Sequence, residues 1–153
     1  MKLGVSVEMT TPFDLANGVR LECAGLVLPW DSSIEKLCAI GKPEIYRHPS
    51  ATNVTWKGEA IFGGVPVHLD AMTASGPNVF YARRVAPAES AQSEYASLLH
   101  ILTAQLGSPH STIVEDGYPW SRWIWGDIGV GVRIAERFVE YVPLMITKGI
   151  LRV

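Results

Sequence analysis

The residue types best suited to chemistry gather in one tract, from Glu115 to Trp125, which holds two adjacent carboxylates, an arginine and four aromatic rings. Paired carboxylates can act as general acid and base when they converge in a cleft. Here Glu115 and Asp116, with Asp127 further on, accompany no nucleophile or catalytic motif, and we expect them to lie in solvated loops. The tract therefore predicts no catalytic residue.

The same tract favours contact with a protein, because Trp, Tyr and Arg are the residue types that most often anchor interfaces. Trp123 and Trp125 are two residues apart, so they project from one face of a strand, and we expect them to pack beneath a helix. Tyr118 and Trp120 are expected in the loop before that strand. The predicted partner-binding residues are Glu115, Asp116, Tyr118, Trp120 and Arg122.

Metal and phosphate sites lack a sequence signature. The four histidines are His48, His68, His100 and His110. They form no H-x-H or H-x-x-x-H arrangement, so we predict no metal site. Gly63-Gly64 lies between two predicted strands instead of before a helix, which indicates a turn and not a phosphate loop. No cofactor is expected.

Length and composition place the 153 residues in a single globular domain spanning 1–153, since 48% are apolar and only 18% are charged. A net charge of −2 gives no electrostatic basis for binding nucleic acid. Cys23 and Cys38 lie in apolar surroundings and are expected to be free and buried. The start of the sequence lacks the features of a signal peptide, and no apolar run is long enough to cross a bilayer. We therefore expect a cytoplasmic protein without a membrane partner.

The first half of the chain predicts strands that flank a short helix. Alternation indicates a strand over residues 3–7, and a second, more apolar strand is expected over residues 19–28. Ser32 with Glu35 has the spacing of a capping box for a helix that ends at Gly41. Residues 44–53 are turn-prone, and further strands are expected over residues 54–62, 65–69 and 79–85.

The second half repeats this order with a longer helix. Apolar residues recur at spacings of three and four from Pro87 to Leu106, which predicts an amphipathic helix of about five turns. A Trp-rich strand and a Val-x-Val strand follow, and residues 138–147 are expected to form a last strand interrupted by Pro143. Both faces of that last strand carry apolar residues, so a homodimer is left open.

Hairpins outnumber helices in this prediction, which favours the α+β class. We expect a mostly antiparallel sheet of about seven or eight strands with two helices on one face. The shared order of elements indicates a tandem β-α-β-β duplication, with half-repeats at about 19–74 and 78–137.

One segment carries a family resemblance. A helix ending in L-x-x-x-L-G-x-P, with Leu102, Leu106, Gly107 and Pro109, leads into the Trp-rich strand and two more apolar strands. This order resembles the small bacterial immunity proteins that neutralise toxins. The resemblance implies a protein without catalytic residues, which blocks a toxin by burying its active site or by holding it in an inactive shape. It assigns no contact residue.

Three functions remain open from the sequence. The first is a non-enzymatic binding protein that inhibits a toxin-like protein partner through the tract at Glu115–Trp125. The second is a small-molecule-binding module or enzyme with a pocket between helix and sheet, where Trp125, His100 and Asp127 would be walls. The third is a structural subunit whose last strand pairs with another copy.

Overall fold

The computed structural model describes residues 10–149, which form twelve strands and two α-helices. The elements are β1 (Gly18–Leu21), β2 (Leu26–Pro29), α1 (Ile34–Cys38), β3 (Glu44–His48), β4 (Ala51–Ile61), β5 (Val65–Met72), β6 (Val79–Arg84), α2 (Ala91–Leu106), β7 (Ser111–Glu115), β8 (Tyr118–Trp125), β9 (Ile128–Arg133), β10 (Ala135–Arg137), β11 (Val139–Tyr141) and β12 (Leu144–Lys148). Short 3-10 turns cover Pro12–Asp14 and Thr73–Ser75. Within residues 10–149, the structure contains no helix with the length and apolar character needed to cross a membrane.

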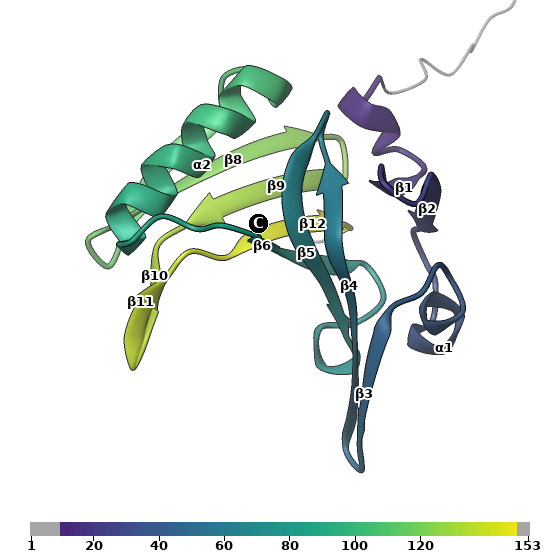
Figure 1. The fold of residues 1–153 in the computed structure, drawn as a ribbon. Coiled ribbons are helices and arrows are strands. Elements are labelled where there is room, and N and C mark those ends of the chain that lie inside the picture. The colour runs from purple at the N-terminus through teal and green to yellow at the C-terminus, as the bar shows by residue number, and fades with distance from the viewer. Residues whose placement is uncertain (1–9, 150–153) are drawn as a thin grey trace, which may run out of the picture.

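Eight of the strands form one antiparallel sheet in the order β3-β4-β5-β6-β12-β9-β8-β7 (Figure 1). The hairpins β1–β2 and β10–β11 form two separate small sheets. The predicted α+β class, with a mostly antiparallel sheet and two helices, is confirmed.

The two halves of the large sheet are built from the same succession of elements, and in each half the strands run in chain order from the edge of the sheet to its centre. A helix is followed by four strands in both halves, as α1-β3-β4-β5-β6 and as α2-β7-β8-β9-β12. The two halves join where β6 pairs with β12, with Phe80 opposite Ile146 and Ala82 opposite Leu144. The β10–β11 hairpin interrupts only the second half, between β9 and β12 (Figure 1).

Each half attaches the end of its helix to the sheet through a tryptophan. The indole Nε1–H of Trp56 donates to the carbonyl of Ile40 at 2.9 Å, and that of Trp123 donates to the carbonyl of Gly107 at 2.8 Å. Both bonds span 16 residues of sequence. Because the side chains of Trp56 and Trp123 are buried, these bonds give their indole N–H groups the partner that burial requires, and they use carbonyls that have no partner within the helix.

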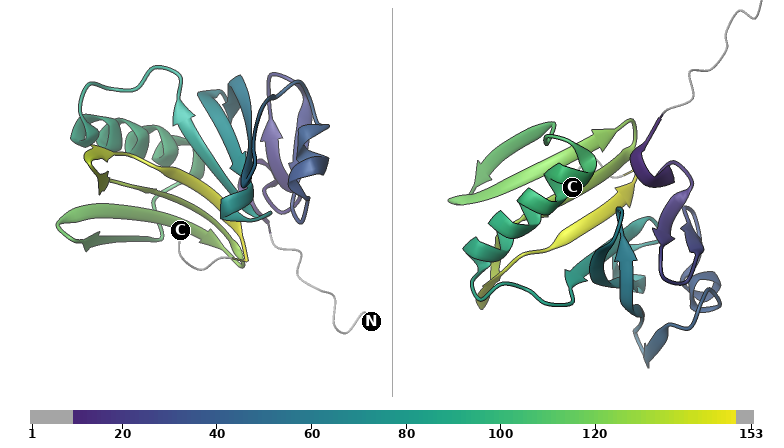
Figure 2. Two further views of the ribbon diagram at one scale, coloured as in Figure 1. Left: turned by 90° about the horizontal axis from the view of Figure 1, so that it is seen from below. Right: turned by 45° about the horizontal axis from the view of Figure 1, so that its top comes forward.

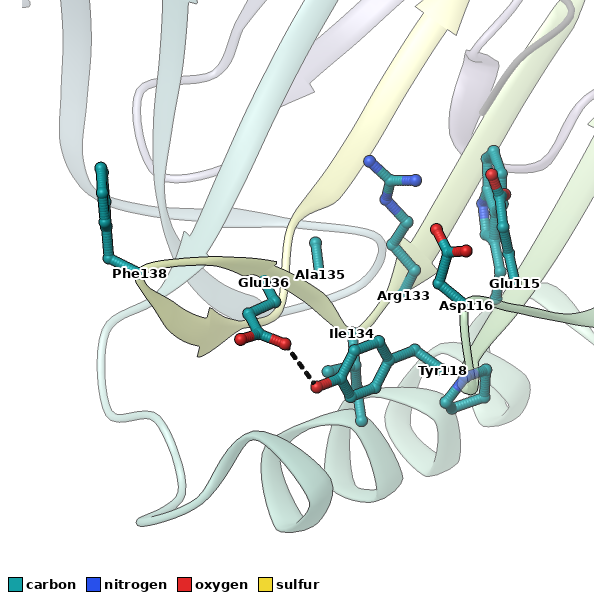
Figure 3. Close-up of a pocket in the computed structure, with 10 residues that line it drawn as sticks. Glu115, Asp116, Tyr118, Arg133, Ile134, Ala135, Glu136 and Phe138 are labelled. Carbon is teal, nitrogen blue, oxygen red and sulfur yellow. Dashed lines mark hydrogen bonds between the residues drawn. The ribbon is translucent and has the colours of Figure 1, made fainter.

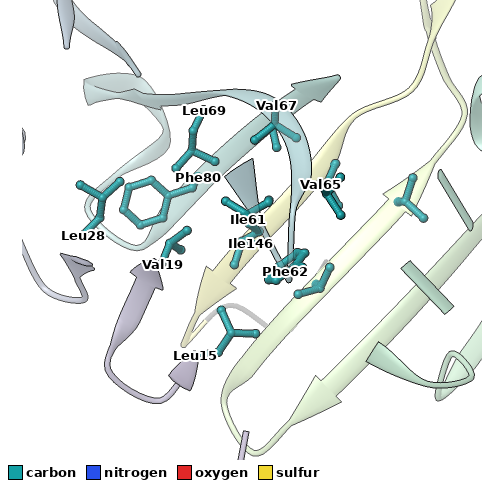
Figure 4. Packing of buried hydrophobic residues seen from close by; sticks show 14 of the residues in the cluster. Leu15, Val19, Leu28, Ile61, Phe62, Val65, Val67, Leu69, Phe80 and Ile146 are labelled. Atoms are coloured by element: carbon teal, nitrogen blue, oxygen red, sulfur yellow. The ribbon is translucent and has the colours of Figure 1, made fainter. Parts of the chain in front are cut away.

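The core lies on one face of the sheet. Trp56, Leu69, Ala82, Leu144 and Val132 are successive cross-strand partners and therefore share that face, and all are buried. The helix α2 covers the half built from β8 and β9, whereas the β1–β2 hairpin and α1 cover the half built from β4 and β5 (Figure 2). Figure 4 shows the central packing, where side chains from β1 and β2 meet those of β5, β6 and β12.

Two secondary-structure predictions in the first half of the chain are wrong. The expected strand over residues 19–28 is a hairpin, because the carboxylate of Glu59 accepts from the backbone N–H groups of Cys23 and Ala24 and so stabilises a turn there. Residues 44–48, expected as turns, form β3 because all five of them pair with residues 51–55 of β4. The strand predicted over residues 3–7 lies outside the described residues.

A buried ion pair joins the end of β6 to the start of α2. Arg84 Nη2 lies 2.8 Å from Glu94 Oε1, and Arg84 Nε donates to Glu94 Oε2 at 3.0 Å. The two side chains are 16% and 10% exposed. The backbone N–H of Ala88 also donates to Glu94, at 2.9 Å. Hydrogen bonding to Glu94 raises the pKa of Arg84 above its ordinary value.

We expect Glu94→Gln to lower the free energy of unfolding by about 3 kcal/mol, because it leaves the guanidinium of Arg84 buried without a counter-charge. Urea unfolding followed by circular dichroism measures this loss. Glu89→Gln, at an exposed position just before the same helix, is the matched control and should change stability little. Equal effects of the two substitutions would show that the ion pair does not stabilise the fold.

Candidate functional site

The tract singled out in the sequence forms the β7–β8 hairpin. Asp116 and Gly117 make its two-residue turn with φ values of +53° and +82°, as a type I′ turn requires. Tyr118 and Trp120 lie within β8, where they pair with Glu115 and Ile113. Their prediction as loop residues is therefore wrong, because pairing with β7 extends the strand to the turn.

The hairpin turn forms one wall of a cleft with a volume of about 440 Å³. The β10–β11 hairpin and the end of β9 form the rest of it (Figure 3). The lining residues are Glu115, Asp116, Tyr118, Pro119, Trp120, Arg133, Ile134, Ala135, Glu136 and Phe138. Four of the five predicted partner-binding residues are thus brought together in one cleft, and the fifth, Arg122, contacts Trp120 beside it.

Two arginines lie against the indole of Trp120. The guanidinium carbons of Arg133 and Arg122 are 4.9 and 5.3 Å from the centre of its ring, within the range of cation–π attraction. Arg122 also donates to the hydroxyl of Ser111 at 3.2 Å. Within residues 10–149, neither arginine forms a salt bridge, and the Nε of Arg133 is buried without a hydrogen-bond partner. The two guanidinium groups therefore fix the position of Trp120, and their positive charges could also bind a negatively charged ligand group.

A polar network attaches the β10–β11 hairpin to the rest of the site. The hydroxyl of Tyr118 donates to Glu136 Oε2 at 2.9 Å (Figure 3), and the amide of Gln92 on α2 donates to Glu140 at 3.1 Å. Hydrogen bonding to Glu140, and then to Glu136, raises the pKa of Tyr118, because the phenol must keep its proton to donate to these carboxylates. The same contact with Tyr118, followed by that with Gln92, lowers the pKa of Glu140.

The tip of the β10–β11 hairpin is apolar and exposed. Phe138 is 98% exposed and has a φ of +70°, a conformation that is strained for a bulky side chain. Val139 and Tyr141 are 69% and 44% exposed. Sequence analysis missed this feature by placing residues 138–147 in one strand. The sequence Arg137-Phe138-Val139 could have indicated an exposed tip, because its two apolar residues are flanked by charged residues.

The residues proposed for a pocket between helix and sheet lie outside the cleft at Trp120. His100 is exposed on α2, and Asp127 is exposed in the β8–β9 turn. Trp125 contacts His110 edge-on, with ring centres 5.6 Å apart. His100, Asp127 and Trp125 are absent from the lining of the cleft at Trp120.

The cleft offers charges and aromatic faces, and its lining contains no Ser, Thr, Cys, His or Lys side chain that could act as a nucleophile. In the described part of the chain, no three His, Cys, Asp or Glu residues are grouped as a metal site would need. Cys23 and Cys38 are free, and Cys23 is exposed, so its predicted burial is wrong. Comparisons with protein-family models, curated proteins and solved structures found no match.

Acid should loosen the attachment of the β10–β11 hairpin. Because the pKa of Glu140 is lowered in the folded state, its interactions persist at neutral pH and are lost as the pH falls through that lowered pKa. We expect Tyr118→Phe to return the pKa of Glu140 towards its ordinary value of 4.5, as measured by NMR titration of its carboxyl carbon. Tyr141→Phe, in the same hairpin, is the control. An unchanged titration in Tyr118→Phe would contradict the proposed contact.

Proposed function

We propose that this protein is a non-enzymatic, cytoplasmic binding protein, and that it acts as an immunity-type inhibitor of a toxin-like protein. The observation that supports the proposal most is the pairing of a cleft built on Trp120 with a neighbouring exposed apolar hairpin tip at Phe138. Exposed apolar residues grouped beside a polar rim are typical of protein-binding surfaces.

The composition of the cleft suits a protein partner. Tyr118 and Trp120 would be the anchors, since large aromatic side chains in partly enclosed sites dominate the energetics of interfaces. Glu115, Asp116 and Arg122 would form the polar rim, where charges contribute more to specificity and association rate than to affinity.

The anchors are also ordered before any partner arrives. Trp120 lies between its two arginines, and Tyr118 is fixed by its bond to Glu136. Ordering a flexible side chain on binding costs about 0.5–1.5 kcal/mol, so a preordered surface keeps more of its contact energy. An inhibitor that acts by covering a toxin needs such a surface and needs no catalytic group.

We expect Trp120→Ala to weaken partner binding by about 2 kcal/mol, which is roughly 30-fold in Kd. The partner is first captured from native host lysate with tagged protein and identified by mass spectrometry. Binding of the purified partner is then measured by calorimetry. Tyr46→Ala is the matched control, because Tyr46 is an aromatic residue that is 63% exposed on β3, at the opposite end of the sheet.

Inhibition is tested separately from binding. The captured partner should arrest growth when it is expressed alone, and co-expression of the wild-type protein, but not of Trp120→Ala, should restore growth. A partner that binds equally well to wild type and Trp120→Ala would overturn the proposed surface. A partner that is harmless by itself would overturn the immunity function while leaving the binding function in place.

A small-molecule site is the second candidate, because a volume of about 440 Å³ lies within the range of ligand pockets. Trp120 is the only tryptophan among the lining residues of the cleft. A ligand bound there should therefore change the fluorescence of the wild-type protein and leave that of Trp120→Phe unchanged. Such a response to any member of a metabolite panel would favour this candidate over protein binding.

A further inference from the structure

The two edge strands of the large sheet, β3 and β7, differ in the charges that they carry. At one end, β3 carries charged side chains that are already paired: Arg47 lies 2.7 Å from Glu35 of α1, and Glu44 lies 2.8 Å from Lys57. Charges along an edge strand oppose the addition of another strand. The β3 edge is therefore protected.

At the other end, the one charged residue of β7, Glu115, lies next to the turn, and the rest of the strand carries no charge. Its sequence is Ser-Thr-Ile-Val-Glu, without proline or lysine, and β8 is its only neighbour among the described strands. Ile113 is 38% exposed and Val114 is 73% exposed, and the salt bridges formed within residues 10–149 involve no residue of β7. A strand of β-branched residues at a sheet end is a template for pairing with another chain.

The turn geometry defines which backbone groups of β7 face outward. In a two-residue hairpin, the residues that flank the turn form a hydrogen-bonded pair, and such pairs alternate along the strands. Glu115 pairs with Tyr118 next to the turn, so Ile113 and Trp120 form the next hydrogen-bonded pair. The N–H and C=O groups of Thr112 and Val114 consequently point away from β8.

This arrangement is complementary to itself. When a second copy of β7 is placed antiparallel with Ile113 opposite Ile113, Thr112 of each copy faces Val114 of the other through the outward backbone groups. Ser111 then faces Glu115, so no two like charges are opposed. The two isoleucines meet at a position without backbone hydrogen bonds, where side chains approach closely.

We propose that β7 is a dimer interface, at which two copies of the chain pair antiparallel about a twofold axis at Ile113. Pairing joins the two eight-stranded sheets into one continuous sheet and covers the β7 edge. The β3 edges remain at the far ends, where their ion pairs prevent further growth. The dimer therefore closes after two copies.

A charge exchange at Ile113 tests both the interface and its register. Sedimentation equilibrium of the wild type at micromolar concentration should give twice the monomer mass of 16.7 kDa. Ile113→Lys and Ile113→Glu should each give the monomer mass, because two like charges would face each other across the axis. An equimolar mixture of the two variants should restore the dimer mass.

Two further variants keep the test decisive. Val114→Pro removes an outward N–H that β8 does not use, so it should give a monomer with an unchanged circular dichroism spectrum. Val139→Lys, on the exposed β10–β11 hairpin, is the control and should remain dimeric. A monomeric wild type, a monomeric mixture of the Ile113 variants, or an assembly larger than a dimer would each overturn the proposal.

This inference does not depend on the proposed function. Dimerisation is measured with the purified protein alone. Trp120→Ala should remain dimeric, because the outward backbone groups of Thr112 and Val114 make the pairing and Trp120, the partner of Ile113 on β8, supplies none of them. Loss of partner binding in Trp120→Ala and loss of the dimer in the Ile113 variants are therefore separate results.

Discussion

The structure depends on the two hydrogen bonds that attach the ends of the helices to the sheet. An eight-stranded sheet with one apolar face needs a cover over both halves, and a short helix such as α1 is not stable by itself. The indoles of Trp56 and Trp123 lie in the apolar face and reach the carbonyls where the chain leaves each helix. Each tryptophan thus fills the core and fixes the position of the helix that covers it.

Local patterns were sufficient to predict the two helices. Ser90 and Ser93 cap α2, and Gly107 ends it, as the Gly-x-Pro signal indicated. The helix begins at Ala91 instead of Pro87, because the cap competes with the helical backbone before it. The end strands β3 and β7 were missed because their stability comes from pairing with β4 and β8, and short polar or turn-flanked strands carry little periodicity of their own.

The candidate site was predictable in its residues but not in its shape. The aromatic and charged side chains of the β7–β8 hairpin are adjacent in sequence, so composition alone indicated them. The cleft also needs Arg133, Glu136 and Phe138, which reach it only because β9 pairs with β8 and the chain then turns back through β10 and β11. A cation stacked on Trp120 from a neighbouring strand has no signature in a single sequence.

The departures from internal symmetry are concentrated in the second half. Both halves contain a helix, a tryptophan that bonds to the end of that helix, and four strands. In the first half, the β1–β2 hairpin covers the sheet together with the short helix α1. Only the second half adds the β10–β11 hairpin, with a strained and exposed Phe138 at its tip. Within residues 10–149, its end strand β7 forms no salt bridge, whereas β3 forms two. Stability alone does not account for either feature, because an exposed phenylalanine at positive φ and an open apolar edge both carry a free-energy or solubility cost. Contact with other molecules would offset those costs, which is why both of our proposals place binding in this half.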